Sequence, residues 1–362
     1  MNKQLRYRTI LITGGAGFVG SNLAISFKRK YPNIRVIAFD NLKRRGSELN
    51  PGRLKQYGIE FVHGDIRNPE DLEFNTKIDL LFECSAEPSV MAGYGESPAY
   101  LINTNLVGTV NCLEFARKVK SDVIFLSTSR IYPYDVINRI KIAEKETRFE
   151  WSEEQETSFP GWSKNGIDVD FTLRGSKSMY GATKLCSEII LQEYIKMYGM
   201  KGVIIRCGVI AGPWQFGRVD QGVFTLWMLA HYFRKPLRYI GFGGRGKQVR
   251  DLLHVDDLFE LLELLITSID SINGEIYNLG GGRAVNLSLL ETTELCEDIT
   301  GNTIEILSEP KTRPADLSIY ITDNQKISDA INWKPRRDAR KILEDTYLWI
   351  KNNENVLRSL LI

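Results

Sequence analysis

The chain has 362 residues, of which 43% are hydrophobic and 25% are charged, a composition typical of a globular protein that buries a large core. Its formal net charge of +2 is too small to make the whole surface attractive to nucleic acid or membranes, so any anion must be bound by local groups. Because single cores rarely grow beyond about 250–300 residues, the length favours a two-part architecture.

Seven short apolar runs, rich in β-branched residues, are predicted to form buried parallel strands at 10–13, 35–40, 60–65, 80–84, 122–128, 202–207 and 275–279. Helical periodicity fills several of the intervals between them, at 18–31, 100–119 and 180–198. Strands that alternate with helices are typical of a doubly wound sheet. We therefore expect an α/β fold of the Rossmann type.

A glycine-rich turn lies between the first predicted strand and the first predicted helix. Gly14, Gly17 and Gly20 have the spacing G-x-x-G-x-x-G, which lets the backbone approach a pyrophosphate at a helix N-terminus, although a tight turn alone would also use glycines. Asp40 closes the second strand, where a carboxylate accepts hydrogen bonds from ribose hydroxyls and repels a 2′-phosphate. Together these residues predict NAD rather than NADP, with Asp65 as a weaker candidate on the adenine side.

A tyrosine and a lysine begin the helix predicted at 180–198. Tyr180 and Lys184 lie one turn apart on the same face, where an ammonium favours the phenolate form of the tyrosine. Tyr347 and Lys351 repeat this spacing near the C-terminus, but we predict an ordinary amphipathic helix there. Only the first pair follows a strand that ends in Ser-Thr-Ser, at 127–129, whose hydroxyls are natural partners for the tyrosine.

The predicted domain boundaries follow from these elements. An NAD-binding Rossmann domain is expected in 1–206, with a strand that returns to it near 250–280. A smaller substrate-binding region is expected in 207–249 and 281–362. The polar stretch 134–178, which contains turn signals at 160–161 and 165–166, is predicted to be a surface insertion near the site.

Cysteine usage and hydropathy limit the compartment and the kind of site. The five cysteines are odd in number and include no C-x-x-C pair, which argues against a disulfide framework and a zinc site and fits a reducing cytoplasm. We expect no metal site. The first apolar run is too short to span a membrane, and the later one at 258–269 carries Glu260 and Glu263 on a polar stripe.

These features, together with the run Gly-Lys-Gln-Val-Arg-Asp at 246–251, resemble the extended short-chain dehydrogenase/reductase family over nearly the whole chain. Within that family the runs 220–222 and 247–251 and the pair Arg313 and Asp316 are most similar to the branch that epimerises a CDP-linked sugar at carbon 2. The resemblance implies an NAD-dependent nucleotide-sugar epimerase that acts through a transient keto-sugar. It also implies a homo-oligomer, either a dimer or a tetramer.

The resemblance implies roles for individual residues. Tyr180 would take a proton from a sugar hydroxyl while NAD takes the hydride, Thr128 would hydrogen-bond the reacting oxygen, and Lys184 would hold the nicotinamide ribose. The implied cofactor contacts are Gly14, Gly17, Phe18, Val19, Gly20, Asp40, Asn41, Asp65, Ile66, Ser85, Ala86, Asn105, Tyr180 and Lys184. The implied substrate contacts are Thr128, Gln221, Lys247, Arg250 and Arg313, with the two arginines on the diphosphate.

Some of these roles have a plainer alternative. Composition alone makes Gln221, Lys247, Arg250 and Arg313 ordinary surface residues, and Asn105 would serve equally well as a buried structural amide. The histidines His63, His231 and His254 are scattered and are expected to be structural.

At three places the sequence departs from the family pattern, and each departure limits which family contacts or reactions we expect in this protein. Glu83-Cys84-Ser85-Ala86 stands where many relatives have His-x-Ala-Ala, so the surroundings of the cofactor pyrophosphate are expected to differ. Val209 stands where sugar 4-epimerases have a phosphate-binding asparagine, so that contact does not transfer. Ser129-Arg130 stands where 4,6-dehydratases have Asp-Glu, which disfavours elimination of water.

Two other functions stay open. A 4-epimerase that acts on a UDP-sugar needs only a different pose of the sugar in the same site. A non-catalytic NAD-binding regulator would keep the fold and lose the chemistry, although the presence of Thr128, Tyr180 and Lys184 argues against it.

Overall fold

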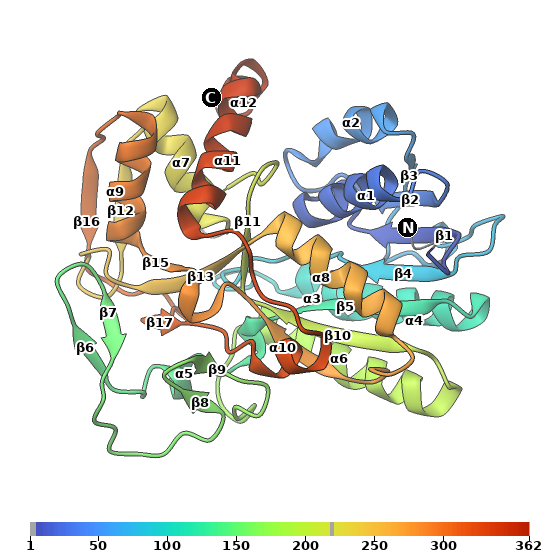
Figure 1. The fold of residues 1–362 in the computed structure, drawn as a ribbon, viewed down its shortest axis with the longest axis horizontal. Helices are drawn as coiled ribbons and strands as arrows, with labels where there is room; N and C mark the ends of the chain where they lie inside the picture. Colours follow the sequence, from blue (N-terminus) through green and yellow to red (C-terminus); the bar gives the residue numbers. More distant parts are fainter. Residues whose placement is uncertain (1–4, 218–220, 362) are drawn as a thin grey trace. The chain divides into compact units, whose positions relative to one another are not determined.

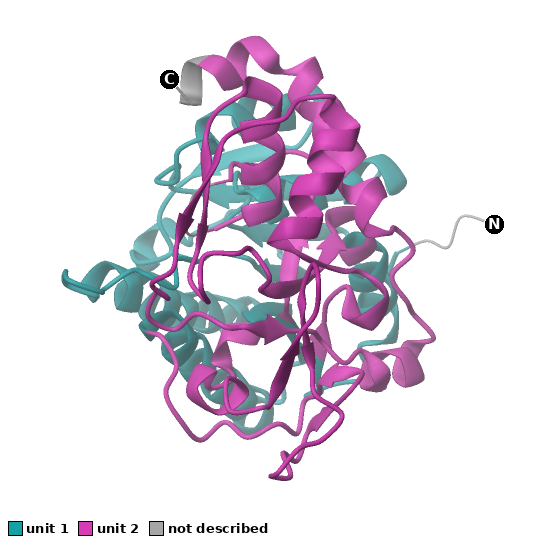
Figure 2. Ribbon diagram, turned by 90° about the vertical axis from the view of Figure 1, so that its left-hand side faces the viewer, with its two compact units in different colours: residues 1–128, 179–206, 259–277 teal, residues 129–178, 207–258, 278–362 magenta. Residues whose placement is uncertain are grey.

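The computed structural model describes residues 5–217 and 221–361, with backbone only for 359–361. The chain divides into two compact units (Figure 2). The first comprises residues 1–128, 179–206 and 259–277, and the second comprises 129–178, 207–258 and 278–362.

The first unit holds almost all of a seven-stranded parallel sheet with the order β14-β10-β5-β4-β1-β2-β3 (Figure 1). Its strands are β1 (Thr9–Thr13), β2 (Arg35–Asp40), β3 (Glu60–His63), β4 (Leu80–Glu83), β5 (Asp122–Thr128), β10 (Gly202–Cys207) and β14 (Ile276–Leu279). The strand order reverses between β1 and β4, and ligands of open α/β sheets generally bind at the carboxyl ends of the strands at such a reversal.

Helices cover both faces of this sheet because apolar side chains point from the strands to either side. The helices are α1 (Phe18–Lys30), α2 (Asn50–Gln56), α3 (Ala99–Ile102), α4 (Gly108–Val119), α6 (Met179–Tyr198) and α8 (Val255–Ser268). On one face, Leu113 of α4 and Leu191 of α6 share a buried cluster with strand residues such as Leu81 and Val123. On the other face, Phe27 of α1 packs between Phe82 of β4 and Phe259 of α8.

The second unit is built around a four-stranded sheet with the order β11-β13-β15, in which β17 also pairs with β13. Its strands are β6 (Ile142–Glu144), β7 (Phe149–Trp151), β8 (Trp162–Ser163), β9 (Gly166–Ile167), β11 (Val209–Ala211), β12 (Leu237–Ile240), β13 (Val249–His254), β15 (Asn286–Ser288), β16 (Ile306–Glu309) and β17 (Ile319–Tyr320). Its helices are α5 (Tyr134–Ile137), α7 (Val223–Phe233), α9 (Leu289–Thr300), α10 (Gln325–Ile331), α11 (Ala339–Asn352) and α12 (Glu354–Leu361). Side chains of α7, α9 and α11 form its main apolar core.

The predicted Rossmann-type sheet is confirmed, since all seven expected strands are present within two residues of their predicted ends. The three expected helices are present as α1, as α3 to α4 with a π-helical turn η3 (Asn103–Val107) between them, and as α6. The division into units differs from the predicted domain boundaries in residues 129–178, which the prediction gives to the Rossmann domain and which belong to the second unit. Residues 259–277 belong to the first unit and lie within the range 250–280 predicted to return to that domain.

The stretch 134–178 is more than the surface insertion that its polar composition predicts. It forms α5 and two antiparallel hairpins, β6–β7 and β8–β9, and it buries Phe149, Trp151, Ile167 and Phe171. Strands of two or three residues are too short to show an alternating pattern, which is why the sequence did not reveal them.

Every helix in the part of the chain that the structure describes is too short or too polar to cross a membrane. The five cysteines are free.

Candidate active site at the strand ends

The glycine-rich turn after β1 is packed too tightly for side chains. Gly14 has a φ of +64°, and its carbonyl oxygen accepts a hydrogen bond from Gly17 N at 2.9 Å. A Cβ at Gly15 would lie 2.6 Å from the Cα of Ala38, and one at Gly20 would lie 2.2 Å from the Gly14 carbonyl oxygen. The close approach of the turn to α1 and β2 therefore requires glycine.

Helix α1 begins directly after this turn and presents an open N-terminus. Gly17 is its N-cap and makes no side-chain cap, and its first turn, which holds Phe18 and Val19, contains no acidic residue. Unpaired backbone N–H groups and the positive end of the helix dipole favour an anion at this position. The turn and the helix together form a cradle that fits a dinucleotide pyrophosphate.

Asp40 at the end of β2 lies beside this cradle. Its Oδ2 accepts a hydrogen bond from Ala16 N at 3.1 Å, and its Oδ1 accepts one from Leu42 N at 2.8 Å. Burial raises the pKa of Asp40, while the backbone N–H donors oppose the rise. The structure thus brings Asp40 to the glycine turn, 24 residues earlier in the chain.

Asn41, Asp65 and Ile66 form a neighbouring group at the ends of β2 and β3. Asn41 Nδ2 donates to Asp65 Oδ2 at 2.9 Å, and Arg67 makes an ion pair with the same carboxylate at 2.6 Å. Burial favours a higher pKa for Asp65, but the hydrogen bonds from Arg67 and Asn41 outweigh it and lower the pKa to about 2. Asp65 is therefore ionised at neutral pH. Ile66 is buried next to Gly108 at the start of α4.

Asn105 joins three segments of the first unit. It lies in the π-helical turn η3, is fully buried, and exchanges two hydrogen bonds with the backbone of Glu87, at 2.7 and 3.0 Å. Its carbonyl oxygen also accepts a hydrogen bond from Ser187 Oγ of α6 at 2.8 Å. All of these partners are structural, and they hold the segment after Ser85 and Ala86 against α6.

Thr128, Tyr180 and Lys184 belong to the same unit. Thr128 is the buried last residue of β5, and Tyr180 and Lys184 lie one turn apart in α6. The Lys184 ammonium lies 3.5 Å from Glu83 Oε2 and 3.9 Å from the centre of the Phe125 ring. Lys184 is thus held between the carboxylate at the end of β4 and an aromatic ring in the middle of β5.

A second buried ion pair fixes α6 against β5, one turn further along the helix. Glu188 accepts hydrogen bonds from Ser127 and from Arg206 of β10, whose Nη2 is 2.9 Å away. Both charged side chains are almost completely buried. The sequence does not reveal this ion pair, although the spacing of Glu188 four residues after Lys184 places the two on the same helix face.

The four predicted substrate residues that lie outside β5 belong to the second unit. Arg250 donates to Asp316 Oδ1 at 2.8 Å and to the carbonyl oxygen of Leu317 at 2.6 Å, and burial lowers its pKa to about 10. The carbonyl oxygen of Arg313 accepts a hydrogen bond from Asp316 N at 3.4 Å. The structure therefore brings Arg250 and the loop of Arg313 together through Asp316.

Gln221 differs from Arg250 because the structure shows a buried polar atom of its side chain without a hydrogen-bond partner in the part of the chain that it describes. Among the described residues, its Oε1 is buried without a hydrogen-bond partner. A buried amide oxygen of this kind is suited to accept a hydrogen bond from a ligand.

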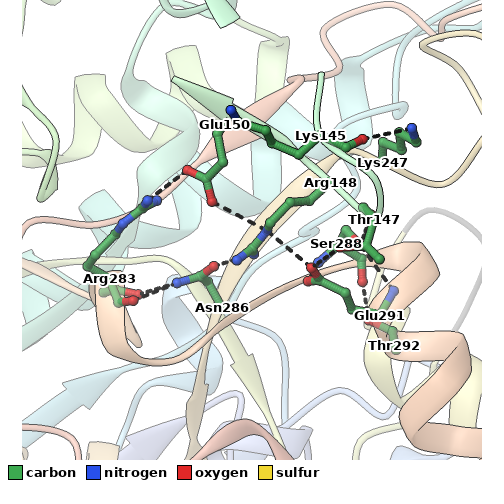
Figure 3. Close-up of polar contacts among 11 residues, drawn as sticks. Lys145, Thr147, Arg148, Glu150, Lys247, Arg283, Asn286, Ser288, Glu291 and Thr292 are labelled. Carbon is green, nitrogen blue, oxygen red and sulfur yellow. Dashed lines mark hydrogen bonds and ion pairs between the residues drawn. The ribbon is translucent and has the colours of Figure 1, made fainter. Parts of the chain in front are cut away.

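Lys247 is held by the β6–β7 hairpin. Its ammonium donates to Glu144 Oε1 and to the carbonyl oxygen of Lys145, each at 2.8 Å (Figure 3 shows the contact to Lys145). Its own carbonyl oxygen accepts a hydrogen bond from Phe149 N at 2.8 Å. The structure thus gives the Lys247 ammonium two protein acceptors, both in the hairpin.

The same hairpin is anchored by a charged network that is not apparent from the sequence (Figure 3). Arg148 lies between Glu150 and Glu291, at 3.5 and 3.4 Å, and donates to Asn286. Arg283 pairs with Glu150 at 2.7 Å. The hydrogen bond to Asn286 ties the hairpin to β15, and the ion pair with Glu291 ties it to the start of α9.

Asp251, the last residue of the run at 246–251, is buried in the second unit and links two loops of its backbone. Its Oδ2 accepts hydrogen bonds from Gly282 N at 3.0 Å and Thr322 N at 3.1 Å. Burial raises its pKa to about 6, against the effect of these hydrogen bonds.

We expect Asp251→Asn to weaken the pH dependence of stability. Wild-type Asp251 keeps its proton in the folded state between its ordinary pKa and about 6, so stability is lost as pH rises through that window. The full loss, above pH 6, amounts to roughly 3 kcal/mol. The amide oxygen of asparagine can accept the same two hydrogen bonds, from Gly282 N and Thr322 N, but the amide does not ionise. Chemical denaturation at pH 4.5 and 7.5 should show a smaller difference for the variant, and equal differences would contradict this assignment.

Two of the three histidines are buried within the second unit. His231 contacts the carbonyl oxygen of Trp227 at 2.8 Å, and His254 lies 3.5 Å from Asp345. Burial lowers the pKa of both. Within the residues described, no group of three or more His, Cys, Asp or Glu side chains is arranged to hold a metal ion.

Comparison with known proteins identifies a family. Residues 10–280 match the model of the NAD dependent epimerase/dehydratase family. The chain is 32% identical to CDP-paratose 2-epimerase of Salmonella typhi, over 94% of this chain and 98% of that protein. It is 28% identical to UDP-glucuronate 4-epimerase of Thermodesulfobacterium geofontis, over 97% and 98% of the two chains.

A solved structure shows the same fold. UDP-glucuronic acid 4-epimerase from Bacillus cereus, in complex with UDP-glucuronic acid and NAD, superposes with a TM-score of 0.75. The two sequences are 26% identical, and the match covers 95% of this chain and 99% of the other.

Proposed function

The chain belongs to the NAD dependent epimerase/dehydratase family, and on that premise we propose that it is a nucleotide-sugar epimerase of the CDP-paratose 2-epimerase type, with CDP-tyvelose as its product. The observation that carries this assignment is the 32% identity to the Salmonella typhi enzyme across nearly the whole of both chains. Polysaccharide biosynthesis is the process such a product would serve.

NAD is the cofactor of this family, and the glycine turn fits it. A Cβ at Gly15 or Gly20 would clash with the backbone, so only glycines allow the close turn that leads into the N-terminus of α1, where an anion is favoured. We propose that the turn with Gly14, Gly17 and Gly20 and the start of α1 bind the pyrophosphate and that Asp40 binds the adenosine ribose. Asn41, Asp65 and Ile66 would border the adenine, and Ser85, Ala86 and Asn105 would border the rest of the cofactor. Bound at these residues, NAD would supply the chemistry of reversible hydride transfer.

The residues of α6 and β5 would move the proton. Tyr180 as a phenolate would remove the proton from the sugar hydroxyl while Lys184 stabilises its negative charge. Thr128 would donate a hydrogen bond to the reacting oxygen. The keto-sugar would then present its other face, and Tyr180 would return the proton, so that one carbon is inverted without net redox.

In the second unit, Arg250 and Arg313 remain the proposed ligands of the substrate diphosphate, because guanidinium groups match phosphate oxygens. The orphaned oxygen of Gln221 supports a role for that residue in binding the sugar or nucleotide. Lys247 is bonded to Glu144 and Lys145, so we propose that it shapes the site through the hairpin as well as contacting the substrate. A homo-oligomer and a cytoplasmic location remain predictions.

Incubation of the purified protein with CDP-, UDP-, GDP- and dTDP-linked sugars, followed by NMR, tests the assignment. We expect inversion at carbon 2 of CDP-paratose with no change in the amount of oxidised cofactor. Inversion at carbon 4 of a UDP-sugar would replace the substrate assignment and keep the mechanism. If every sugar returns unchanged and no keto product forms, the proposed function is wrong.

A further inference from the structure

The catalytic lysine has a buried acidic partner. Glu83 is the last residue of β4, its side chain is 0% exposed, and its Oε2 lies 3.5 Å from the Nζ of Lys184, which is 1% exposed. Moving both charged groups of such a pair out of water costs free energy. The pair is therefore stable only if each group also makes other favourable contacts.

Each end of this pair has such partners. Glu83 Oε1 accepts a hydrogen bond from Ser85 N at 2.9 Å and a longer one from Thr13 Oγ1 at 3.5 Å. The Lys184 ammonium lies over the face of Phe125, 3.9 Å from the ring centre. Strand register explains the grouping, because Thr13, Glu83 and Phe125 are aligned across β1, β4 and β5.

Among the residues that the structure describes, other titratable groups near the pair come from α4 and α6. Cys112 faces it from α4, and burial and the charge of Glu83 raise the pKa of its thiol. Tyr180 and Glu188 lie one turn to either side of Lys184 in α6, and Glu188 is already paired with Arg206. Glu83 is therefore the acidic partner of Lys184; burial raises the pKa of its carboxyl group, and the Lys184 ammonium and the Ser85 N–H oppose the rise.

We propose that Glu83 is a positioning residue that keeps the Lys184 ammonium charged and in place at the carboxyl end of the sheet. Burial alone favours the neutral amine, whereas a carboxylate beside it favours the ammonium. The two contacts of the ammonium, to Glu83 and to the Phe125 ring, also fix the direction of the long lysine side chain. The inference deepens the proposed function, because it is through Lys184 that Glu83 would act on the phenolate of Tyr180.

The first test needs no substrate. Melting temperatures of Glu83→Gln, Lys184→Met and the double variant form a thermodynamic cycle. Glu83→Gln should lower the Tm by about 5 °C or more, because it leaves a buried ammonium without its counter-charge. The loss in the double variant should be clearly smaller than the sum of the single losses. Additive losses would show that the two side chains are not coupled and would overturn the inference, whatever the enzyme's substrate proves to be.

The second test measures kcat and KM against pH with the substrate that the NMR panel identifies. Glu83→Gln should move the alkaline limb of the kcat profile down by at least about one pH unit, because Lys184 would lose its proton more easily. KM should change less than about twofold, and Glu83→Asp should restore part of the shift, because the carboxylate is kept. Glu188→Gln is the matched control, since it breaks the other buried ion pair of α6 and lowers stability without moving this limb. An unchanged limb in Glu83→Gln would contradict the inference while leaving the proposed reaction intact.

Discussion

Replacing Tyr180 with phenylalanine is expected to lower kcat by about 10³-fold or more while leaving the cofactor bound, since general acid–base groups contribute about 10²–10⁴-fold. The change removes one hydroxyl and keeps the ring, so α6 and its buried contacts to β5 should stay intact. Steady-state turnover measured by NMR and cofactor content measured by absorbance would check both halves of this expectation.

The chain offers its own control for that experiment. Tyr347 and Lys351 of α11 have the same spacing, but the ring of Tyr347 packs against Tyr232 in the apolar core of the second unit. Tyr347→Phe should therefore keep turnover within about twofold of wild type, since it removes no proton-transfer group. Comparable losses in the two variants would mean that Tyr180 has no special role.

Replacing Gly20 with alanine is expected to reduce NAD affinity by roughly 10–100-fold and to destabilise the first unit by about 1–3 kcal/mol. The added Cβ would lie 2.2 Å from the carbonyl oxygen of Gly14 and 2.9 Å from the Cα of Gly15. Both contacts are with backbone, so the turn itself must move away from α1. Calorimetric titration with NAD and chemical denaturation would measure the two effects.

Gly52 provides the matched substitution, because a Cβ at this position of α2 meets nothing within 4 Å. Gly52→Ala should leave NAD affinity unchanged and should, if anything, raise stability by about 0.5–1 kcal/mol, since alanine restricts the unfolded chain. A normal affinity in Gly20→Ala would show that the cradle tolerates a side chain and would argue against its role in binding the pyrophosphate.

Much of the candidate site could be predicted because its residues are grouped locally in the sequence. Gly14, Gly17 and Gly20 share one turn, and Tyr180 and Lys184 share one turn of helix. The position of Asp40 followed from the length of one strand–helix–strand unit, and the structure places its carboxylate on the glycine turn. The predicted roles of Arg250 and Arg313 depended on the resemblance to a family, and the structure adds their shared neighbour Asp316.

The ion pairs of the site could not be predicted in this way. Lys184 and Glu83 are 101 residues apart, and Lys247 and Glu144 are 103 residues apart. A carboxylate in a sequence carries no sign of which cation it will meet, because the partner depends on strand order and register. The hairpins within 134–178 escaped prediction for a related reason, since their short strands are stabilised by partners that are distant in the chain.

The sequence by itself determined the seven strands, the α/β alternation, the glycine turn and the tyrosine–lysine pair. Each of these features depends only on the periodicity or spacing of residues that are close together in the chain. Only the tertiary structure decided that Glu83 lies against Lys184, that Glu188 clamps α6 to β5 and that the 134–178 stretch forms hairpins packed beside Lys247. The physical reason is that parallel strands align Thr13, Glu83 and Phe125, which are far apart in the chain, and the balance of buried charge depends on the side chains that this alignment brings together.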